Sequence, residues 1–296
     1  MDARATYTEV QAKSALHRLK RKIPYSWDLN IYRGCEHGCR YCYALYSHTY
    51  LDSTDYFSEI FIKTNIVDLL EQELKSEKWK GDVINIGGVT DSYQPAEARY
   101  RLMPDILKLL IKYKTPAIIS TKSSLVLRDY DLIDRLSKIT YINIAATVTV
   151  MDDSIRAGLE PGSADSAERF QVLKEFRKTN ASIGLHVMPI IPLITDTEEN
   201  FERMFALARD CGVDYVLPGT LYLKGDTRRY FFHFLQTHYP EKVESYKSLY
   251  KTGGAAKAYK AGLYAMVNRL RDKYRLSSSY MKPMRARLPE KGGDQL

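Results

Sequence analysis

Residues 29–42 read LNIYRGCEHGCRYC, a short apolar strand that runs straight into three cysteines. Cys35, Cys39 and Cys42 follow the pattern C-x3-C-x2-C and are three of the four cysteines in the chain. They come at the C-terminal end of the strand, which is the end that carries active sites in α/β folds. Two glycines in the same stretch allow tight bends, so one short loop can wrap around a metal.

Beyond this stretch, strand-like and helix-like runs alternate as far as about residue 220. Six strands separated by helices, with about 30 residues per unit, favour a parallel sheet with right-handed crossovers. The spacing alone fits both a flat doubly wound sheet and an open partial barrel. We expect strands at 29–33, 83–86, 117–121, 141–150, 182–191 and 214–217, and helices at 65–76, 99–112, 129–138, 166–178 and 198–210.

Three thiolates in this arrangement can hold three irons of a [4Fe–4S] cluster and leave the fourth iron open for a ligand. Two other interpretations stay open at this point. One is a structural zinc site with His37 as the fourth ligand, and the other is three unrelated buried cysteines. Zinc sites commonly pair two ligand couples far apart in the sequence, and this chain has no second couple. We therefore favour the iron–sulfur cluster.

The cysteine pattern after the first of six β–α units resembles the radical S-adenosylmethionine (radical SAM) superfamily, as does the aromatic Tyr41 before the third cysteine. Three runs resemble its spore photoproduct lyase-like subfamily: YRGCEHGC at 32–39, GVTDSYQPAE at 88–97 and TKS at 121–123. The likeness covers most of the chain. It implies an α/β fold, a partial (β/α)6 TIM-like barrel with an added C-terminal helical region.

This resemblance implies a [4Fe–4S] cluster and S-adenosylmethionine (SAM) as cofactors. In the superfamily the open iron chelates the amino and carboxylate groups of SAM, and one electron from the reduced cluster breaks the bond from sulfur to C5′. The resulting 5′-deoxyadenosyl radical abstracts hydrogen from the substrate. The resemblance also implies an electron donor of the flavodoxin or ferredoxin type.

The resemblance further implies where SAM is held. The backbone at Gly87 and Gly88 would receive the amino group, Thr90 and Asp91 would add contacts, and Lys122 would pair with the carboxylate. A strand-ending turn, a helix cap and a surface lysine are the respective alternatives for these three groups.

Four more side chains are candidates with open roles. Tyr41 would lie near the adenine and Thr147 would bond the ribose or the carboxylate, with plain packing as the alternative for both. Glu160 would contact SAM or order a loop. Glu97 would line the substrate side or cap the next helix. His186, alone among apolar residues of a strand, is expected to be a satisfied core histidine.

Charge and tyrosine content point to a substrate class. The chain has 44 basic and 36 acidic residues, a net charge of +8, and residues 221–296 hold sixteen Lys and Arg against six Asp and Glu. Nine of the 23 tyrosines lie in this basic region. Basic residues among aromatics can contact phosphates and stack on bases, so we expect a nucleic acid. A solvated basic surface and half-buried packing tyrosines are the alternatives.

Two other functions stay open: a radical SAM enzyme acting on a peptide or small metabolite, and a non-catalytic, zinc-containing nucleic-acid-binding protein. The subfamily implies a lyase in DNA repair. That lyase relies on an additional cysteine as hydrogen donor, and this chain has no cysteine between Cys42 and Cys211. We expect Cys211, at a helix end, to be a small core residue.

We expect three parts: a basic lead-in at 1–28, a radical SAM (β/α)6 core at 29–220 and a basic, tyrosine-rich helical region at 221–296 with a loose tail from Leu276. No apolar run reaches membrane-spanning length, and the N-terminus lacks the apolar core of a signal peptide. We therefore expect a cytoplasmic protein, as a monomer without membrane contact.

Overall fold

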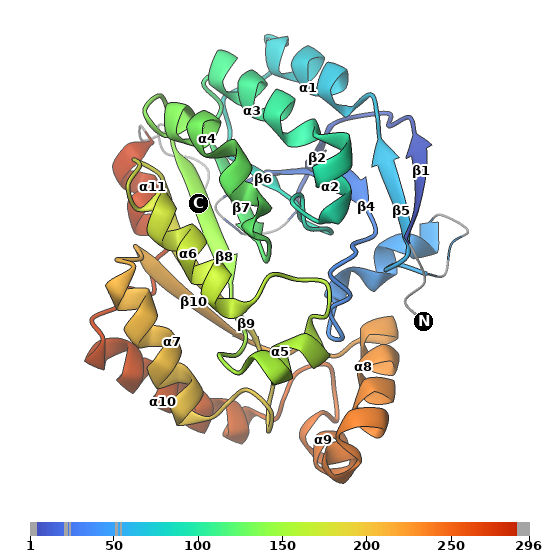
Figure 1. Cartoon of the computed structure of the whole chain (residues 1–296), viewed down its shortest axis with the longest axis vertical. Helices are drawn as coiled ribbons and strands as arrows, with labels where there is room; N and C mark the ends of the chain where they lie inside the picture. Colours follow the sequence, from blue (N-terminus) through green and yellow to red (C-terminus); the bar gives the residue numbers. More distant parts are fainter. Residues whose placement is uncertain (1–4, 21–22, 24, 51–52, 54, 289–296) are drawn as a thin grey trace.

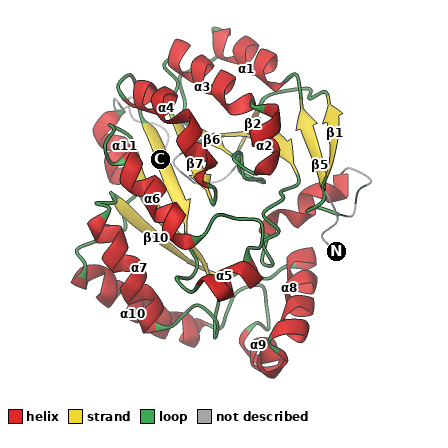
Figure 2. Ribbon diagram, viewed as in Figure 1, coloured by secondary structure: helices red, strands yellow, loops and turns green. Residues whose placement is uncertain are grey.

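The computed structural model describes the chain except residues 1–4, 21–22, 24, 51–52, 54 and 289–296. Its centre is a seven-stranded sheet of order β10-β9-β8-β7-β6-β3-β2 (Figures 1 and 2). The strands of this sheet are β2 (Leu16–Arg18), β3 (Trp27–Leu29), β6 (Ile84–Ile86), β7 (Ala117–Thr121), β8 (Ile142–Thr147), β9 (Ser182–Ile190) and β10 (Tyr215–Thr220).

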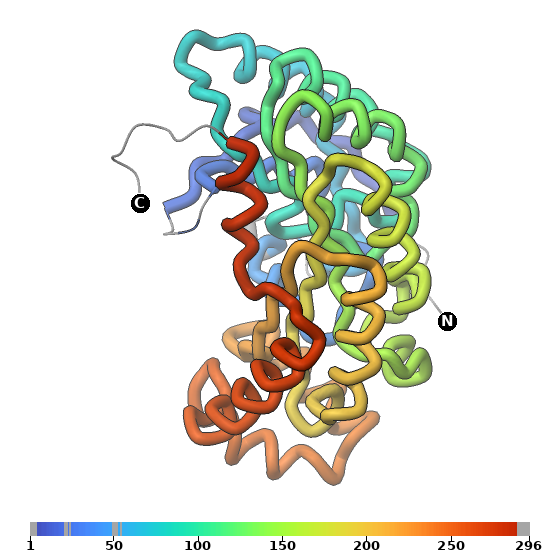
Figure 3. The backbone as a smooth tube through the Cα atoms, turned by 90° about the vertical axis from the view of Figure 1, so that its left-hand side faces the viewer, coloured from blue at the N-terminus to red at the C-terminus, as the bar shows by residue number. Residues whose placement is uncertain are grey.

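Six of these strands, β3 and β6 to β10, are parallel neighbours in chain order. Right-handed crossovers between such neighbours place the connecting helices on the same side of the sheet. In Figure 3 the green to gold helices line one side and the red C-terminal segment crosses the other. The partial barrel is confirmed over the flat doubly wound sheet. The helices between its strands are α1 (Ile66–Lys75), α2 (Pro95–Tyr100), α3 (Leu102–Lys112), α4 (Tyr130–Ser137), α5 (Asp153–Leu159), α6 (Ser166–Phe176) and α7 (Glu198–Asp210).

The two faces of the sheet differ in polarity. Leu185 and Val187 of β9 are fully buried in the main apolar core, which also includes helix residues. His186 lies between them and therefore faces the opposite, concave side, where part of its surface stays exposed. The same alternation on neighbouring strands places polar residues on this concave face, namely Asp28, Asn85, Ser120, Lys122, Asn143, Thr147, His186 and Tyr215.

A second sheet, of three strands, lies beside the first β–α unit of the barrel (Figure 1). Its order is β1 (Thr6–Val10), β5 (Glu59–Lys63) and β4 (Tyr32–Arg33). The expected lead-in, 1–28, thus contributes β1 to this sheet and β2 and most of β3 to the large one. The strand expected at 29–33 is not continuous, because Leu29 ends β3 and Tyr32–Arg33 form β4 in the other sheet. Tyr7 of β1 donates a hydrogen bond of 2.7 Å to Glu36 Oε1, which ties the lead-in to the cysteine loop.

The C-terminal region is helical, as expected, but its tail was predicted wrongly. A helix forms within the segment expected to be loose, and Met284 of this helix packs with Val83, Ile118 and Tyr141 near the N-terminal ends of the strands. Residues 289–296 of the expected tail lie outside the described residues. The elements here are α8 (Gly225–His238), η3 (Pro240–Lys242), α9 (Val243–Leu249), α10 (Lys257–Lys273) and α11 (Met281–Arg287).

Tyrosines of this region serve largely as packing residues. Tyr246 and Tyr250 are fully buried in an apolar cluster that also contains Cys39 and Tyr41 of the cysteine loop. Their rings stack with an interplanar angle of 5°. The packing alternative is confirmed for these two, whereas Tyr222 is 59% exposed. Helices α8 and α9 thus cover the cysteine loop.

Several predicted boundaries shift for local reasons. The helix expected at 99–112 is divided at Arg101, which adopts a left-handed φ of 50° between α2 and α3. The strand expected at 141–150 ends at Thr147, and the loop after the cysteines forms η1 (Tyr43–Tyr50). A further 3-10 helix, η2 (Ser124–Asp129), precedes α4. No described helix is long and apolar enough to cross a membrane.

Candidate active site

The three cysteines lie on the loop that follows β4. Cys35 and Cys39 are buried and Cys42 is half-buried. The loop turns tightly, because Gly34 has φ of +84° and Gly38 has φ of +63°. A Cβ at Gly34 would lie 2.6 Å from a backbone oxygen of β5. The predicted tight bends in this stretch are confirmed.

The surroundings of the thiols disfavour free thiolates. Burial is the largest cause that raises the pKa of Cys39 to about 12, and burial raises the pKa of Cys35 and Cys42 as well. Metal ligation requires the thiolate form, so a bound metal must supply the compensating charge. Three thiols on one loop are the donor set that an iron–sulfur cluster with one open iron uses.

Among the residues that the structure describes, no group of three His, Cys, Asp or Glu side chains lies close enough together to hold one metal ion.

His37, the expected fourth ligand of a zinc site, is engaged elsewhere. Its Nε2 lies 3.1 Å from Asp91 Oδ2, and its Nδ1 lies 2.8 Å from the carbonyl oxygen of Gly162. Both ring nitrogens therefore face acceptor oxygens of the protein.

Asp91 joins three loops at the strand ends. Its carboxylate accepts hydrogen bonds from the Thr121 hydroxyl and from the backbone N–H groups of Lys122 and Tyr93, besides facing His37. Burial alone would raise the pKa of Asp91, but His37 and these hydrogen bonds lower it to about 2. Because these partners occupy its oxygens, the arrangement favours a positioning role for Asp91 over direct contact with SAM.

Lys122, which is half-buried, differs from the buried Arg169. Its Nζ lies 5.7 Å from the centroid of the Tyr41 ring. Burial alone would lower the pKa of Lys122, but Cys39 and Glu160 raise it above its ordinary value, so the ammonium stays charged. Arg169 pairs with a carboxylate, whereas no ion pair within the described part of the chain involves Lys122. Its charge is therefore available to an anionic ligand.

The turn after β6 fits tightly against the rest of the site. Gly87 has φ of +90°, and a Cβ at Gly88 would lie 2.4 Å from Asp28 Oδ2. The Thr90 hydroxyl donates a hydrogen bond of 2.7 Å to the carbonyl oxygen of Gly34. This bond ties the turn directly to the cysteine loop.

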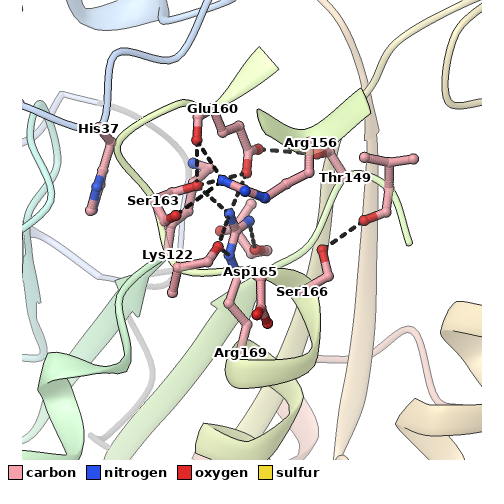
Figure 4. Close-up of polar contacts among 12 residues, drawn as sticks. His37, Lys122, Thr149, Arg156, Glu160, Ser163, Asp165, Ser166 and Arg169 are labelled. Atoms are coloured by element: carbon pink, nitrogen blue, oxygen red, sulfur yellow. Dashed lines mark hydrogen bonds and ion pairs between the residues drawn. The ribbon is translucent and has the colours of Figure 1, made fainter. Parts of the chain in front are cut away.

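Glu160 is fully buried, and its carboxylate is used inside the protein (Figure 4). It pairs with Arg169 at 2.5 Å and accepts hydrogen bonds from the hydroxyls of Tyr41 and Thr149. Burial alone would raise the pKa of Glu160, but Arg169 and Lys122 lower it below its ordinary value. These contacts favour the loop-ordering interpretation of Glu160 over contact with SAM.

Thr147 and His186 lie opposite each other in the register of β8 and β9, on the concave face. Thr147 is buried, and its carbonyl oxygen accepts a hydrogen bond from Arg169. His186 Nε2 lies 3.1 Å from the Tyr215 hydroxyl, which itself donates to Asn143 Oδ1 at 2.9 Å. His186 is hydrogen-bonded, as expected, but it is half-buried rather than part of the core.

Two remaining candidates have structural roles. Glu97 accepts hydrogen bonds of 3.1 Å from the backbone N–H groups of Leu102 and Met103, which open α3. It also pairs with Arg128 at 2.6 Å. The helix-cap alternative is therefore confirmed for Glu97. Cys211 is 8% exposed within the main apolar core, which confirms that prediction.

The sequence did not allow several residues of the site to be predicted. Glu36 accepts a hydrogen bond of 2.8 Å from the Ala96 N–H at the start of α2, and Arg169 forms the buried ion pair described above. Tyr215 and Asn143 fix the orientation of His186. Each of these contacts joins elements far apart in the chain, and local patterns do not report such contacts. The one usable signal was strand alternation, which places Asn143 and Tyr215 on the concave face.

Several known proteins are similar to this chain in sequence over most of its length. The family model for the radical SAM superfamily matches residues 29–208. A Mycobacterium tuberculosis (strain H37Rv) protein with the name "uncharacterized protein" is 33% identical over 281 residues, which cover 93% of this chain and 83% of that protein. A Methanocaldococcus jannaschii protein of the same description is 29% identical and covers 82% of this chain and 88% of its own length.

Solved structures show the same fold. A spore photoproduct lyase variant with bound AdoMet and dinucleoside spore photoproduct has a TM-score of 0.67 at 14% identity, covering 90% of this chain and 78% of its own. Streptococcus suis SuiB, bound to the precursor peptide SuiA, has a TM-score of 0.54 at 14% identity, covering 87% of this chain and 48% of its own.

Proposed function

We propose that this chain, which belongs to the radical SAM superfamily, is an enzyme that cleaves SAM reductively and abstracts hydrogen from a nucleic acid. Members of this superfamily use a [4Fe–4S] cluster and SAM. In the proposal, Cys35, Cys39 and Cys42 hold the cluster. When bound, the reduced cluster supplies the electron that makes SAM a source of hydrogen-abstracting radical chemistry.

One observation carries the proposal: two buried thiols and one half-buried thiol share a site with an ammonium group that has no carboxylate partner among the described residues. Cys39 and Lys122 are close enough for each to change the pKa of the other. Thiols alone would suit many metals. A charged lysine beside them suits an anionic ligand, and the carboxylate of SAM is such a group.

The other residues of the site bind, orient and exclude water. Lys122 pairs with the SAM carboxylate, and Asp91 holds the backbone of Lys122 in place. Gly87 and Gly88 give the ligand access to the backbone after β6. Tyr41 lies under Lys122, with Thr147 on the neighbouring strand. The apolar cluster from α8 and α9 against Cys39 keeps water from this side of the loop.

Exposed tyrosines support a nucleic acid as the substrate. Tyr222, which follows β10 at one edge of the sheet, is 59% exposed. Tyr43 and Tyr46, on η1, are 61% and 45% exposed, and the Tyr43 hydroxyl donates to the Gly88 carbonyl oxygen near the other edge. Such rings can stack on bases, and the basic helical region can contact phosphates. The solved lyase neighbour holds a dinucleoside photoproduct.

A peptide substrate is the second candidate, because SuiB, of the same fold, binds a precursor peptide. Salt dependence separates the two. Phosphate contacts release counterions, so the affinity for a single-stranded oligonucleotide should fall steeply as salt rises from 50 to 200 mM. We propose a flavodoxin- or ferredoxin-type protein as the electron donor in the cytoplasm.

The test uses full-length protein purified without oxygen and reconstituted with iron and sulfide. We expect about four irons per chain and release of 5′-deoxyadenosine from SAM with dithionite, because superfamily chemistry needs one such cluster. Cys39→Ala should abolish release, and Cys211→Ala, in the core, should retain it. A colourless protein that binds zinc and releases nothing would contradict the proposal.

A further inference from the structure

Residues 159–164, from the last residue of α5 to the loop before α6, contact the cysteine loop at several points along its length. We call this segment the clasp. The Arg40 N–H donates to the Leu159 carbonyl oxygen at 2.8 Å, and the Gly162 N–H donates to the His37 carbonyl oxygen at 3.0 Å. The Tyr41 hydroxyl donates a hydrogen bond to Glu160, and the His37 ring lies 2.8 Å from the Gly162 carbonyl oxygen. A Cβ added at Gly38 would lie 3.1 Å from Pro161.

The closest of these approaches requires a glycine. A Cβ placed on Gly162 would lie 2.2 Å from the backbone oxygen of Glu36, and that oxygen belongs to the cysteine loop itself. Gly158, only four residues earlier, has no atom within 4 Å of such a Cβ. Of these two glycines, only Gly162 lies against the backbone of the cysteine loop. Any side chain at Gly162 must therefore displace that loop.

A buried ion pair holds the clasp in place. Arg169 of α6 pairs with Glu160 and donates hydrogen bonds to the carbonyl oxygens of Thr147 and Ala164, at 2.8 and 2.7 Å. Arg169 is 1% exposed. Glu160 in turn accepts a hydrogen bond from the hydroxyl of Tyr41, the residue before the third cysteine. Helix α6 and strand β8 thus fix the clasp, and the clasp fixes the cysteine loop.

The clasp also reaches the residue that is expected to bind SAM. The Ala164 N–H donates a hydrogen bond of 3.0 Å to the carbonyl oxygen of Lys122. One segment of six residues therefore contacts both the cysteine loop and the end of β7.

We propose that the clasp is a positioning element that forms the cysteine loop before any cluster binds and sets its distance from Lys122. This inference rests on the proposed function for the identity of the cluster. It separates this chain from small metal domains that fold only around their metal. The cluster would enter a loop that is already shaped, and clasp variants would weaken its retention while the rest of the fold stays intact.

The first test is amide hydrogen exchange on the full-length chain without iron. The Arg40 and Gly162 amides form the two backbone bonds between the clasp and the cysteine loop, so both should exchange slowly in the metal-free protein. Exchange at the rate of an unstructured peptide would overturn the inference. This result does not depend on which metal the protein binds.

The second test compares Gly162→Ala with Gly158→Ala in reconstituted protein, by the rate at which an iron chelator removes the cluster. We expect faster release for Gly162→Ala, by about 10-fold, as for changes to residues that orient metal ligands. Gly158→Ala should match the wild type, because its new methyl group meets nothing. Equal release from both variants would overturn the inference.

Tyr41→Phe is the milder variant if Gly162→Ala fails to fold. It removes only the hydroxyl that bonds Glu160 and keeps the ring. We expect only a modest loss of thermal stability in the metal-free chain, because Glu160 keeps Arg169 and Thr149 as partners. We also expect faster cluster release and an altered electron paramagnetic resonance (EPR) change when SAM is added. Wild-type release and an unaltered EPR response would overturn the inference. A wild-type chain that takes up no iron would contradict the proposed function, while the exchange result would still decide the inference.

Discussion

The start of α6 and the end of β7 each bring one cation to the cysteine loop, and the two are used differently. Arg169, from α6, is buried against Glu160 at 2.5 Å and also donates to backbone carbonyls. Lys122, at the end of β7, has a ring beneath it but no carboxylate partner in the described chain. A cation that is paired with a carboxylate of the protein stabilises the site, whereas a cation without such a partner can bind an anionic ligand.

The largest effect should come from breaking the matched pair. Arg169→Met leaves the buried Glu160 carboxylate without its cation, and loss of one partner of a buried pair costs ~3–5 kcal/mol in the free energy of unfolding. Urea denaturation of the metal-free chain measures this loss. The control is Arg177→Met, which removes the exposed pair with Asp214 and should cost less than ~1 kcal/mol. Similar losses for both would contradict the comparison.

A smaller effect, of another kind, is expected at Lys122. Lys122→Met removes no ion pair within the protein, so the metal-free chain should stay nearly as stable as the wild type. Loss of a charged hydrogen bond to the SAM carboxylate should raise the dissociation constant for SAM by ~10- to 100-fold, equivalent to ~1.4–2.8 kcal/mol. Calorimetric titration of reconstituted protein measures it. A large loss of stability with unchanged SAM affinity would reverse the roles of the two cations.

The third prediction concerns pH and the concave face. Burial, with a smaller effect of Lys122, lowers the pKa of His186 to about 4. An unfolded histidine takes up its proton near pH 6.5, so the unfolded state gains stability relative to the folded state as the pH falls from about 6.5 to about 4. His186→Gln removes this titration.

The wild type should therefore lose stability relative to His186→Gln over this interval, by at most ~1.4 kcal/mol per pH unit. Denaturation curves of both proteins at pH 7, 6 and 5 provide the measurement. Parallel pH profiles would show that His186 titrates normally in the folded chain.

Much of the fold could be predicted because its signals are local. The helices at Ile66–Lys75 and Glu198–Asp210 carry apolar residues at helical spacing, and both lie where the pattern placed them. The strand at Ala117–Thr121 matches its predicted limits. The division at Arg101 was missed, because a left-handed arginine carries no glycine signal.

For the candidate site, only the positions of its residues along the chain could be predicted. The spacing of the cysteines and the lysine at a strand end are visible in the sequence. The roles of Asp91 and Glu160 cannot be predicted from the sequence. Their partners, His37 and Arg169, come from other elements of the fold. A sequence pattern shows that a carboxylate is present near a site, and only the fold shows whether its charge is already matched.

In the proposed site, three cysteines hold a cluster with an open iron beside an unmatched lysine. EPR spectroscopy of the reduced, reconstituted protein, with and without SAM, is the decisive measurement for this arrangement. We predict that SAM changes the spectrum of the wild type, and that Lys122→Met keeps about four irons per chain but needs far more SAM for the same change. A wild-type spectrum that SAM leaves unaltered, or a Lys122→Met protein that responds at the same SAM concentration, would contradict it.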